Sequence, residues 1–203
     1  MRAIKSWWVV LAFLSGFALA MWAEEVLLNW HDNRLEFSAP RVHFLEEGNP
    51  MQLLHNAEAV PFGFQVTLWS GNHNHIFERL HDEFVVSYNL WEEKYMVVKT
   101  QSPARKIEHL TASDAEKWCW QQMTLDVSSI PPDEPLWVRV DVRAEDDKGS
   151  PLFGRGVSES GISLTTLIDL FSRPPRRGQT HWGPYDLGPF TLDEVKQKPH
   201  HGS

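Results

Sequence analysis

The chain has 203 residues, of which 42% are hydrophobic, and it carries 27 acidic against 19 basic residues. This size and apolar content are typical of a globular protein with one main domain and exclude a wholly disordered chain. The formal net charge of −8 disfavours nucleic acid as a partner, because phosphate backbones are bound by basic surfaces. Cys119 is the single cysteine, so no intrachain disulfide can form, and we expect a buried free thiol.

The N-terminus has the features of a secretory signal. Arg2 and Lys5 precede the apolar run WWVVLAFLSGFALA, and small residues occupy both cleavage-site positions in Ala18-Leu19-Ala20. This pattern predicts a signal peptide at residues 1–20 and a mature periplasmic protein. The alternative is an uncleaved anchor that reaches residue 23, since the apolar run then approaches the lower length limit for crossing a bilayer. Cleavage would leave 17 basic and 27 acidic residues, a net charge of −10.

Hydrophobic residues beyond the signal recur mostly with a period of two, which predicts strands. The first two expected strands form a hairpin that turns at Asp32-Asn33. In the longest strand Arg79, His81 and Glu83 fall on a face that we expect to be solvated, whereas the apolar residues stand at even positions: Ile76, Leu80, Phe84, Val86, Tyr88 and Leu90. The expected strands are 25–31, 34–39, 61–69, 76–91, 94–100 and 136–145.

Helix signals are fewer. Pro50 suits a first helical position after Asn49, Ser113 and Glu116 form a capping-box pattern, and apolar residues line one side of 163–171. The predicted fold is therefore mainly β to α+β, an antiparallel β-sandwich with two or three short helices. We expect one globular domain at 24–190 and a disordered tail at 191–203.

The stretch SGNHNH raises the question of a metal site, because His73 and His75 could supply two ligands from one loop. His81 lies six residues beyond His75, about 20 Å along an extended strand, so one ion cannot bind both. The other histidines are scattered without ligand spacing. We interpret the stretch as a polar loop and predict no cofactor, and a metal-dependent hydrolase that uses His73 and His75 is the alternative function.

Tryptophans off the apolar faces are the other candidate binding residues. Trp91, Trp120 and Trp137 fall there by strand parity or helix phase, where an aromatic side chain can stack on a ligand or contact a partner. The competing interpretation is that these side chains pack beneath loops. No set of acid, base and nucleophile in the sequence predicts catalytic residues.

The phrases GFQVTLWSG, DEFVVSYNLWEEKYMVV, ASDAEKWCWQQM and LWVRVDVRAED, in this order, resemble an exported bacterial family of unknown function. That family is often encoded near NtrY-type membrane sensor kinases. The resemblance implies an exported domain without assigned catalytic residues. Together with the residues above, it favours a non-enzymatic binding or accessory module of the bacterial envelope, with an envelope or membrane protein as partner. The sequence does not identify a small ligand, and it leaves open an apolar one inside the sandwich.

Overall fold

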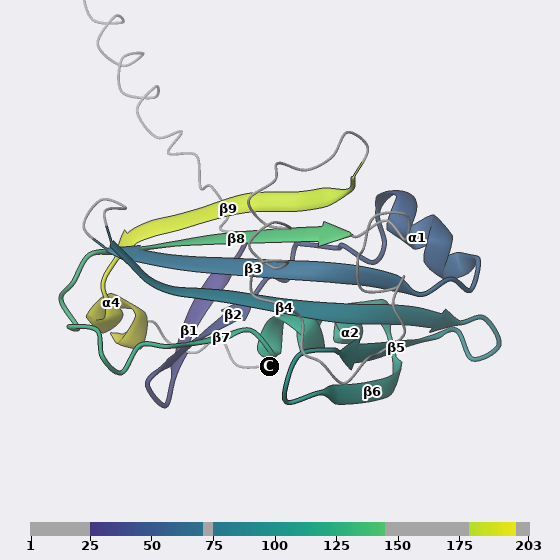
Figure 1. Cartoon of the computed structure of the whole chain (residues 1–203), viewed down its shortest axis with the longest axis horizontal. Coiled ribbons are helices and arrows are strands. Elements are labelled where there is room, and N and C mark those ends of the chain that lie inside the picture. Colours follow the sequence, from purple (N-terminus) through teal and green to yellow (C-terminus); the bar gives the residue numbers. More distant parts are fainter. Residues whose placement is uncertain (1–24, 71–74, 145–178, 198–203) are drawn as a thin grey trace, which may run out of the picture.

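The computed structural model describes residues 25–70, 75–144 and 179–197. These residues form two antiparallel sheets, of three and six strands, together with short helices (Figure 1). The small sheet and helix α2 (Ala112–Gln121) lie on one side of the large sheet. The predicted fold class, a mainly β to α+β sandwich with short helices, is confirmed.

The small sheet begins with the expected hairpin. Strands β1 (Leu27–His31) and β2 (Arg34–Ser38) pair antiparallel, and β7 (Thr124–Asp126) adds to the free side of β2. The two residues between β1 and β2, Asp32 and Asn33, have φ of 46° and 61°. A two-residue turn with both φ values positive matches the twist of a hairpin, which explains why Asp and Asn stand there.

The strands of the large sheet are β3 (Val60–Ser70), β4 (His75–Asn89), β5 (Lys94–Lys99), β6 (Arg105–Leu110), β8 (Leu136–Ala144) and β9 (His181–Phe190). Their order in the sheet is β6-β5-β4-β3-β8-β9. Four of its strands were predicted, although β6, β9 and the small sheet's β7 were not. Strand β3 is central: it pairs with β4 along its whole length and with β8 from Phe62 to Ser70.

The core fills the space between the sheets. Alternate residues of β3 and β8, such as Phe64 and Val140, are fully buried on the inner face of the large sheet. Phe44, in the segment before the first helix, packs edge-on against Phe62 and Phe64 at ring-centroid distances of 5.0 and 5.4 Å. Helix α2 contacts β2 of the small sheet and β5 of the large sheet, so it bridges the two layers.

Two helices begin at residues other than those the sequence predicted. Helix α1 (Gly48–His55) starts two residues before Pro50. In α2 the cap is Thr111, whose hydroxyl accepts the backbone N–H of Asp114 at 3.2 Å, so the predicted capping box of Ser113 and Glu116 is wrong. The helix expected at 163–171 lies outside the described residues.

The side chain of Glu116 is instead buried inside the protein. Its carboxylate accepts the backbone N–H of Leu45 at 2.9 Å and contacts Nδ1 of His43 at 3.2 Å. Burial raises the pKa of Glu116, and these two contacts oppose that effect. The residue therefore fixes the segment before α1 against α2.

The ordered domain also extends further than expected. Residues 191–203 were predicted to form a disordered tail, but α4 (Leu192–Gln197) is helical, and its Leu192 and Val195 are buried. Helix α4 contacts β1 and so covers one end of the sandwich. This corrects the predicted domain limit of residue 190. No helix in the described part of the chain is long and apolar enough to cross a membrane.

Candidate functional site

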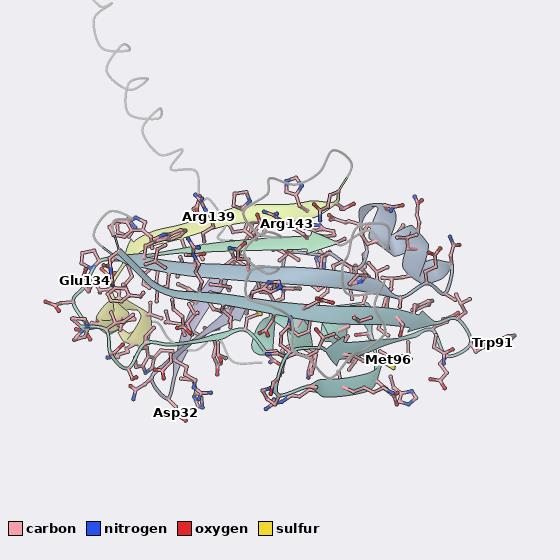
Figure 2. The ribbon with its side chains drawn as sticks, viewed as in Figure 1. Asp32, Trp91, Met96, Glu134, Arg139 and Arg143 are labelled. Carbon is pink, nitrogen blue, oxygen red and sulfur yellow. The ribbon has the colours of Figure 1, made fainter. Side chains whose placement is uncertain are left out.

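The turn between β4 and β5, residues 89–93, is the most exposed apolar feature of the described surface. We call it the β4–β5 tip. Trp91 is 96% exposed and Leu90 is 49% exposed, whereas most large apolar side chains are buried. Figure 2 shows the Trp91 side chain pointing away from the molecule at one end, with Glu134 at the opposite end. Trp91 was predicted as a candidate binding residue, and its position gives it access to a partner.

The backbone of the β4–β5 tip is held by local hydrogen bonds. The side-chain oxygen Oδ1 of Asn89 accepts the N–H of Trp91 at 3.0 Å and the N–H of Glu92 at 3.3 Å. Asn commonly stabilises turns in this way. Glu93 then takes a positive φ of 52°, which returns the chain into β5. Trp91 is thus exposed on an ordered turn.

The surroundings of Trp91 are acidic. Glu92 and Glu93 follow it directly, and both are exposed. The Glu92 carboxylate lies 2.8 Å from Nδ1 of His109, a residue of β6, which ties the tip to the neighbouring strand. An exposed apolar ring with two carboxylates beside it complements an apolar pocket that has a basic residue at its rim.

Trp120 does not belong to this site, and its prediction as a binding residue is wrong. It is 1% exposed, and its ring packs edge-on against Phe64 at a centroid distance of 5.2 Å. The buried stripe of α2 includes Glu116, Cys119 and Trp120, so it is wider than the helix phase suggested. Trp120 is therefore a core residue.

Trp137 lies on the outer face of the large sheet, away from the small sheet. Its register partner on β3 is Trp69, and both side chains are partly buried. The Arg139 guanidinium lies 5.6 Å from the centroid of the Trp69 ring and forms two hydrogen bonds with Asp186, at 2.6 and 2.9 Å. Strand parity could have identified Trp69, because it alternates with the buried Leu68. Asp186 lies on β9, a strand that the sequence pattern does not predict.

The structure does not gather the predicted tryptophans into one site. Trp91 belongs to the β4–β5 tip, Trp120 to the core and Trp137 to the outer face of the large sheet. These three positions are on different elements with different surroundings. Only the β4–β5 tip combines a fully exposed ring with an ordered backbone.

Polar residues occupy the middle of the same outer face. His81, Gln65 and Asp141 are register neighbours on β4, β3 and β8, with Glu83 and Arg143 in the next row. The solvated face predicted for β4 is partly wrong, because Glu83 is only 5% exposed and His81 is half-buried. Central strands have neighbours on both sides, which shields even polar side chains from water.

The electrostatics of this row keep its histidine neutral. Burial lowers the pKa of His81 to about 4, although the hydrogen bond from Nδ1 to the carbonyl oxygen of Phe64, at 3.0 Å, opposes the shift. Near neutral pH His81 is therefore an uncharged side chain that bonds to the backbone of the neighbouring strand. A structural role therefore fits His81 better than a role as a proton donor.

Of the two histidines predicted as candidate metal ligands, only His75 lies among the described residues. His75 is the first residue of β4, it is exposed, and its ring contacts that of Phe77 edge-on at 4.9 Å. His73 lies outside the described residues. Among the residues that the structure describes, no group of three or more His, Cys, Asp or Glu side chains could hold a metal ion.

Cys119 is buried, as expected. Burial raises the pKa of its thiol well above the ordinary value, and the nearby Glu116 carboxylate adds to that shift. A thiol that resists ionisation is a poor nucleophile. Cys119 therefore acts as an apolar core residue in α2.

Comparison of the chain with family models, with curated proteins and with solved structures finds no match. The resemblance to an exported bacterial family therefore stays a prediction.

Proposed function

We propose that this protein is a non-enzymatic, exported binding module of the bacterial envelope, and that it docks on an envelope or membrane protein through the β4–β5 tip. The observation that carries the proposal is the 96% exposure of Trp91 on a turn ordered by Asn89. Tryptophan is among the residues that most often dominate binding energy at protein interfaces. Covering this ring with a partner would remove its apolar surface from water, which favours association.

The ordered backbone strengthens this proposal. Association costs free energy when loops and side chains lose freedom, and a turn that is already fixed by hydrogen bonds reduces that cost. The acidic residues beside Trp91 favour a partner whose apolar pocket has basic residues at its rim, and they disfavour an anionic lipid surface. The periplasmic location rests on the sequence of the first twenty residues.

The test is photo-crosslinking in cells, with a photoreactive amino acid at Glu93, next to the tryptophan. We expect one discrete adduct with an envelope or membrane protein, and we expect Trp91→Ala in the same chain to remove it. Because Trp91 is exposed, the substitution should change the free energy of unfolding by no more than about 0.5 kcal/mol. Loss of the adduct would therefore reflect lost binding and not lost folding.

A matched control places the photoreactive residue at Asp133, an exposed position beside Glu134 at the opposite end of the molecule (Figure 2). This position should not yield the adduct. If the adduct persists in Trp91→Ala, or forms equally from position 133, the β4–β5 tip is not the docking element. If position 93 yields no adduct with an envelope protein, the proposed partner class is wrong.

A further inference from the structure

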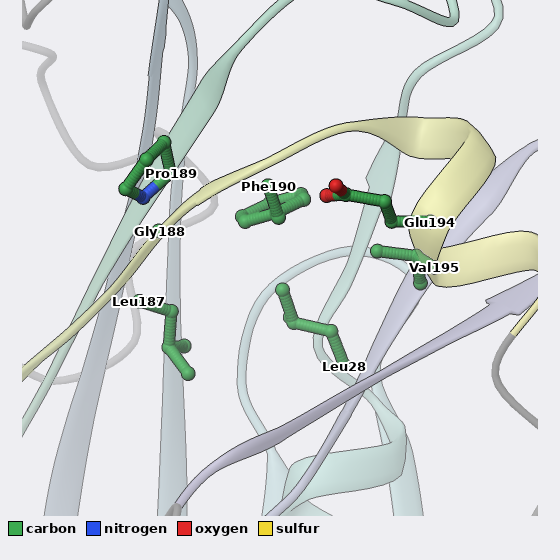
Figure 3. Close-up of a pocket in the computed structure, with 7 residues that line it drawn as sticks. All are labelled: Leu28, Leu187, Gly188, Pro189, Phe190, Glu194 and Val195. Atoms are coloured by element: carbon green, nitrogen blue, oxygen red, sulfur yellow. The ribbon is translucent and has the colours of Figure 1, made fainter.

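A pocket of about 360 Å³ opens where the two sheets meet at the end covered by α4 (Figure 3). Its walls come from β1, from the last residues of β9 and from α4. The apolar side chains are Leu28, Leu187, Phe190 and Val195, and Glu194 supplies a carboxylate. Pockets for small molecules usually combine such apolar walls with a few polar groups, and this volume is near the lower end of their range.

The polar group of the pocket is anionic. Figure 3 shows the Glu194 carboxylate directed toward the ring of Phe190. A carboxylate beside an aromatic ring favours a cation, because the negative charge and the π-electron face both attract it. An anionic ligand would meet repulsion from Glu194 and from a chain with a formal net charge of −8.

Glu194 is held in place without a ligand. Its Oε2 accepts the N–H of Thr191 at 2.9 Å, and its own N–H donates to Oγ1 of Thr191 at 3.3 Å. This reciprocal capping box orients the side chain and leaves Oε1 for a second donor. The carboxylate is therefore preorganised, which lowers the cost of binding.

The nearest basic residue on α4 is engaged elsewhere. The Lys196 ammonium lies 4.4 Å from the centroid of the Trp30 ring and 3.7 Å from the carboxylate of Asp193. Lys196 thus has its own aromatic and acidic partners. The same pairing of a ring with a carboxylate around Lys196 illustrates the chemistry that Phe190 and Glu194 offer to a ligand.

We propose that this pocket binds a small organic cation, an alkyl- or arylammonium compound. Its apolar body fills the space between Leu28, Leu187 and Val195, and its ammonium group lies against the carboxylate of Glu194 and the ring of Phe190. This binding site is independent of the docking proposed for the β4–β5 tip.

The experiment titrates the protein with three probes of similar size and follows binding by NMR. The probes are 2-phenylethylammonium, 2-phenylethanol and 3-phenylpropanoate. We expect the cation to bind most tightly, with chemical-shift changes at the residues of the pocket. Glu194 is exposed, so Glu194→Gln should weaken the cation about fivefold, because one charged partner is replaced by a neutral one. Gln also fits the capping box, so α4 should persist.

Asp193→Asn is the matched control, since it removes the same charge one residue away without lining the pocket. It should leave affinity for the cation within about twofold. The proposal is overturned if no probe binds up to about 10 mM, if the anion binds as well as the cation, or if Asp193→Asn weakens binding as much as Glu194→Gln. Trp91→Ala should not affect this titration, so failure here is distinguishable from failure of the docking proposal.

Discussion

At the scale of single residues, a buried ion pair joins β4 to β5. Asp82 faces the core from β4, and its carboxylate lies 2.8 Å from the ammonium of Lys99 on β5, with both side chains largely buried. Burial raises the pKa of Asp82, and the hydrogen bond and charge of Lys99 oppose this shift. An isolated charge at this position would be costly, so each partner is needed by the other.

His81 predicts a specific dependence of stability on pH. The folded protein keeps His81 neutral down to about pH 4, whereas the unfolded chain protonates it near its ordinary pKa of 6.5. The unfolded state therefore binds more protons between these values, and the free energy of unfolding falls as the pH decreases through them. From pH 7 to pH 4.5 we expect this residue to account for a loss of about 2–3 kcal/mol.

The measurement is chemical denaturation of the wild type and His81→Asn at several pH values. The asparagine amide can still donate to the carbonyl oxygen of Phe64, but it does not titrate. Carboxyl groups with raised pKa, such as those of Asp82 and Glu116, titrate in both proteins, so the difference between the two curves isolates His81. Parallel curves would contradict the burial of a neutral imidazole.

At the scale of elements, alternation predicted the strands that bury one face. Strand β8 shows this directly: Val138, Val140 and Val142 are buried, whereas Arg139 between them is exposed. Strands without that pattern were missed. β6 is mostly exposed on both faces, β7 has three residues, and β9 contains Pro184 and Pro189, which ordinarily argue against a strand.

Tertiary packing also explains the missed helix and the misplaced cap. Helix α4 has only six residues, too few for a periodic signal, and its order depends on burial of Leu192 and Val195. In α2 both Thr111 and Ser113 are residue types that can cap a helix, and the structure uses Thr111. The Glu116 carboxylate accepts the buried backbone N–H of Leu45 and therefore does not form a capping box with Ser113. Of the candidate site, the sequence identified Trp91 by parity, but exposure and turn geometry depend on long-range packing.

The faces of β8 provide the second prediction. Val140→Asp places a charge on the fully buried face between the sheets, and we expect a loss of more than about 4 kcal/mol in the free energy of unfolding. Arg139→Gln removes an exposed ion pair with Asp186 and should cost less than about 1 kcal/mol. Thermal and chemical denaturation of both variants would test this. Similar losses in the two proteins would show that the assignment of inner and outer faces is wrong.

At the scale of the whole molecule, both edges of the large sheet disfavour addition of a foreign strand. Edge strand β9 contains two prolines, which cannot donate backbone hydrogen bonds. The opposite edge strand, β6, carries charged side chains, and its His109 has a positive φ of 61° near an irregular pairing with β5. Charges and irregularities protect edges against pairing. Strand addition at these two edges is therefore disfavoured, which agrees with the proposal that docking uses the β4–β5 tip.

The last prediction concerns the location of the whole chain. Strand β1 begins at Leu27, and Val26 before it is already buried, so cleavage after Ala20 would leave every described residue in the mature protein. When the full chain is produced in a bacterium, we expect a periplasmic protein with the mass of residues 21–203 and Met21 as its first residue. Intact-mass measurement of the periplasmic and membrane fractions tests this.

The control is a chain with Ala18→Phe and Ala20→Phe, because signal peptidase requires small residues at both positions. This variant should keep its full mass and remain in the membrane fraction, since its apolar segment is no longer removed. A wild-type chain that also keeps residues 1–20 in the membrane fraction would establish the uncleaved anchor instead. This protein would then be tethered to the membrane by its N-terminal segment. A partner of the β4–β5 tip would have to lie close to the membrane surface.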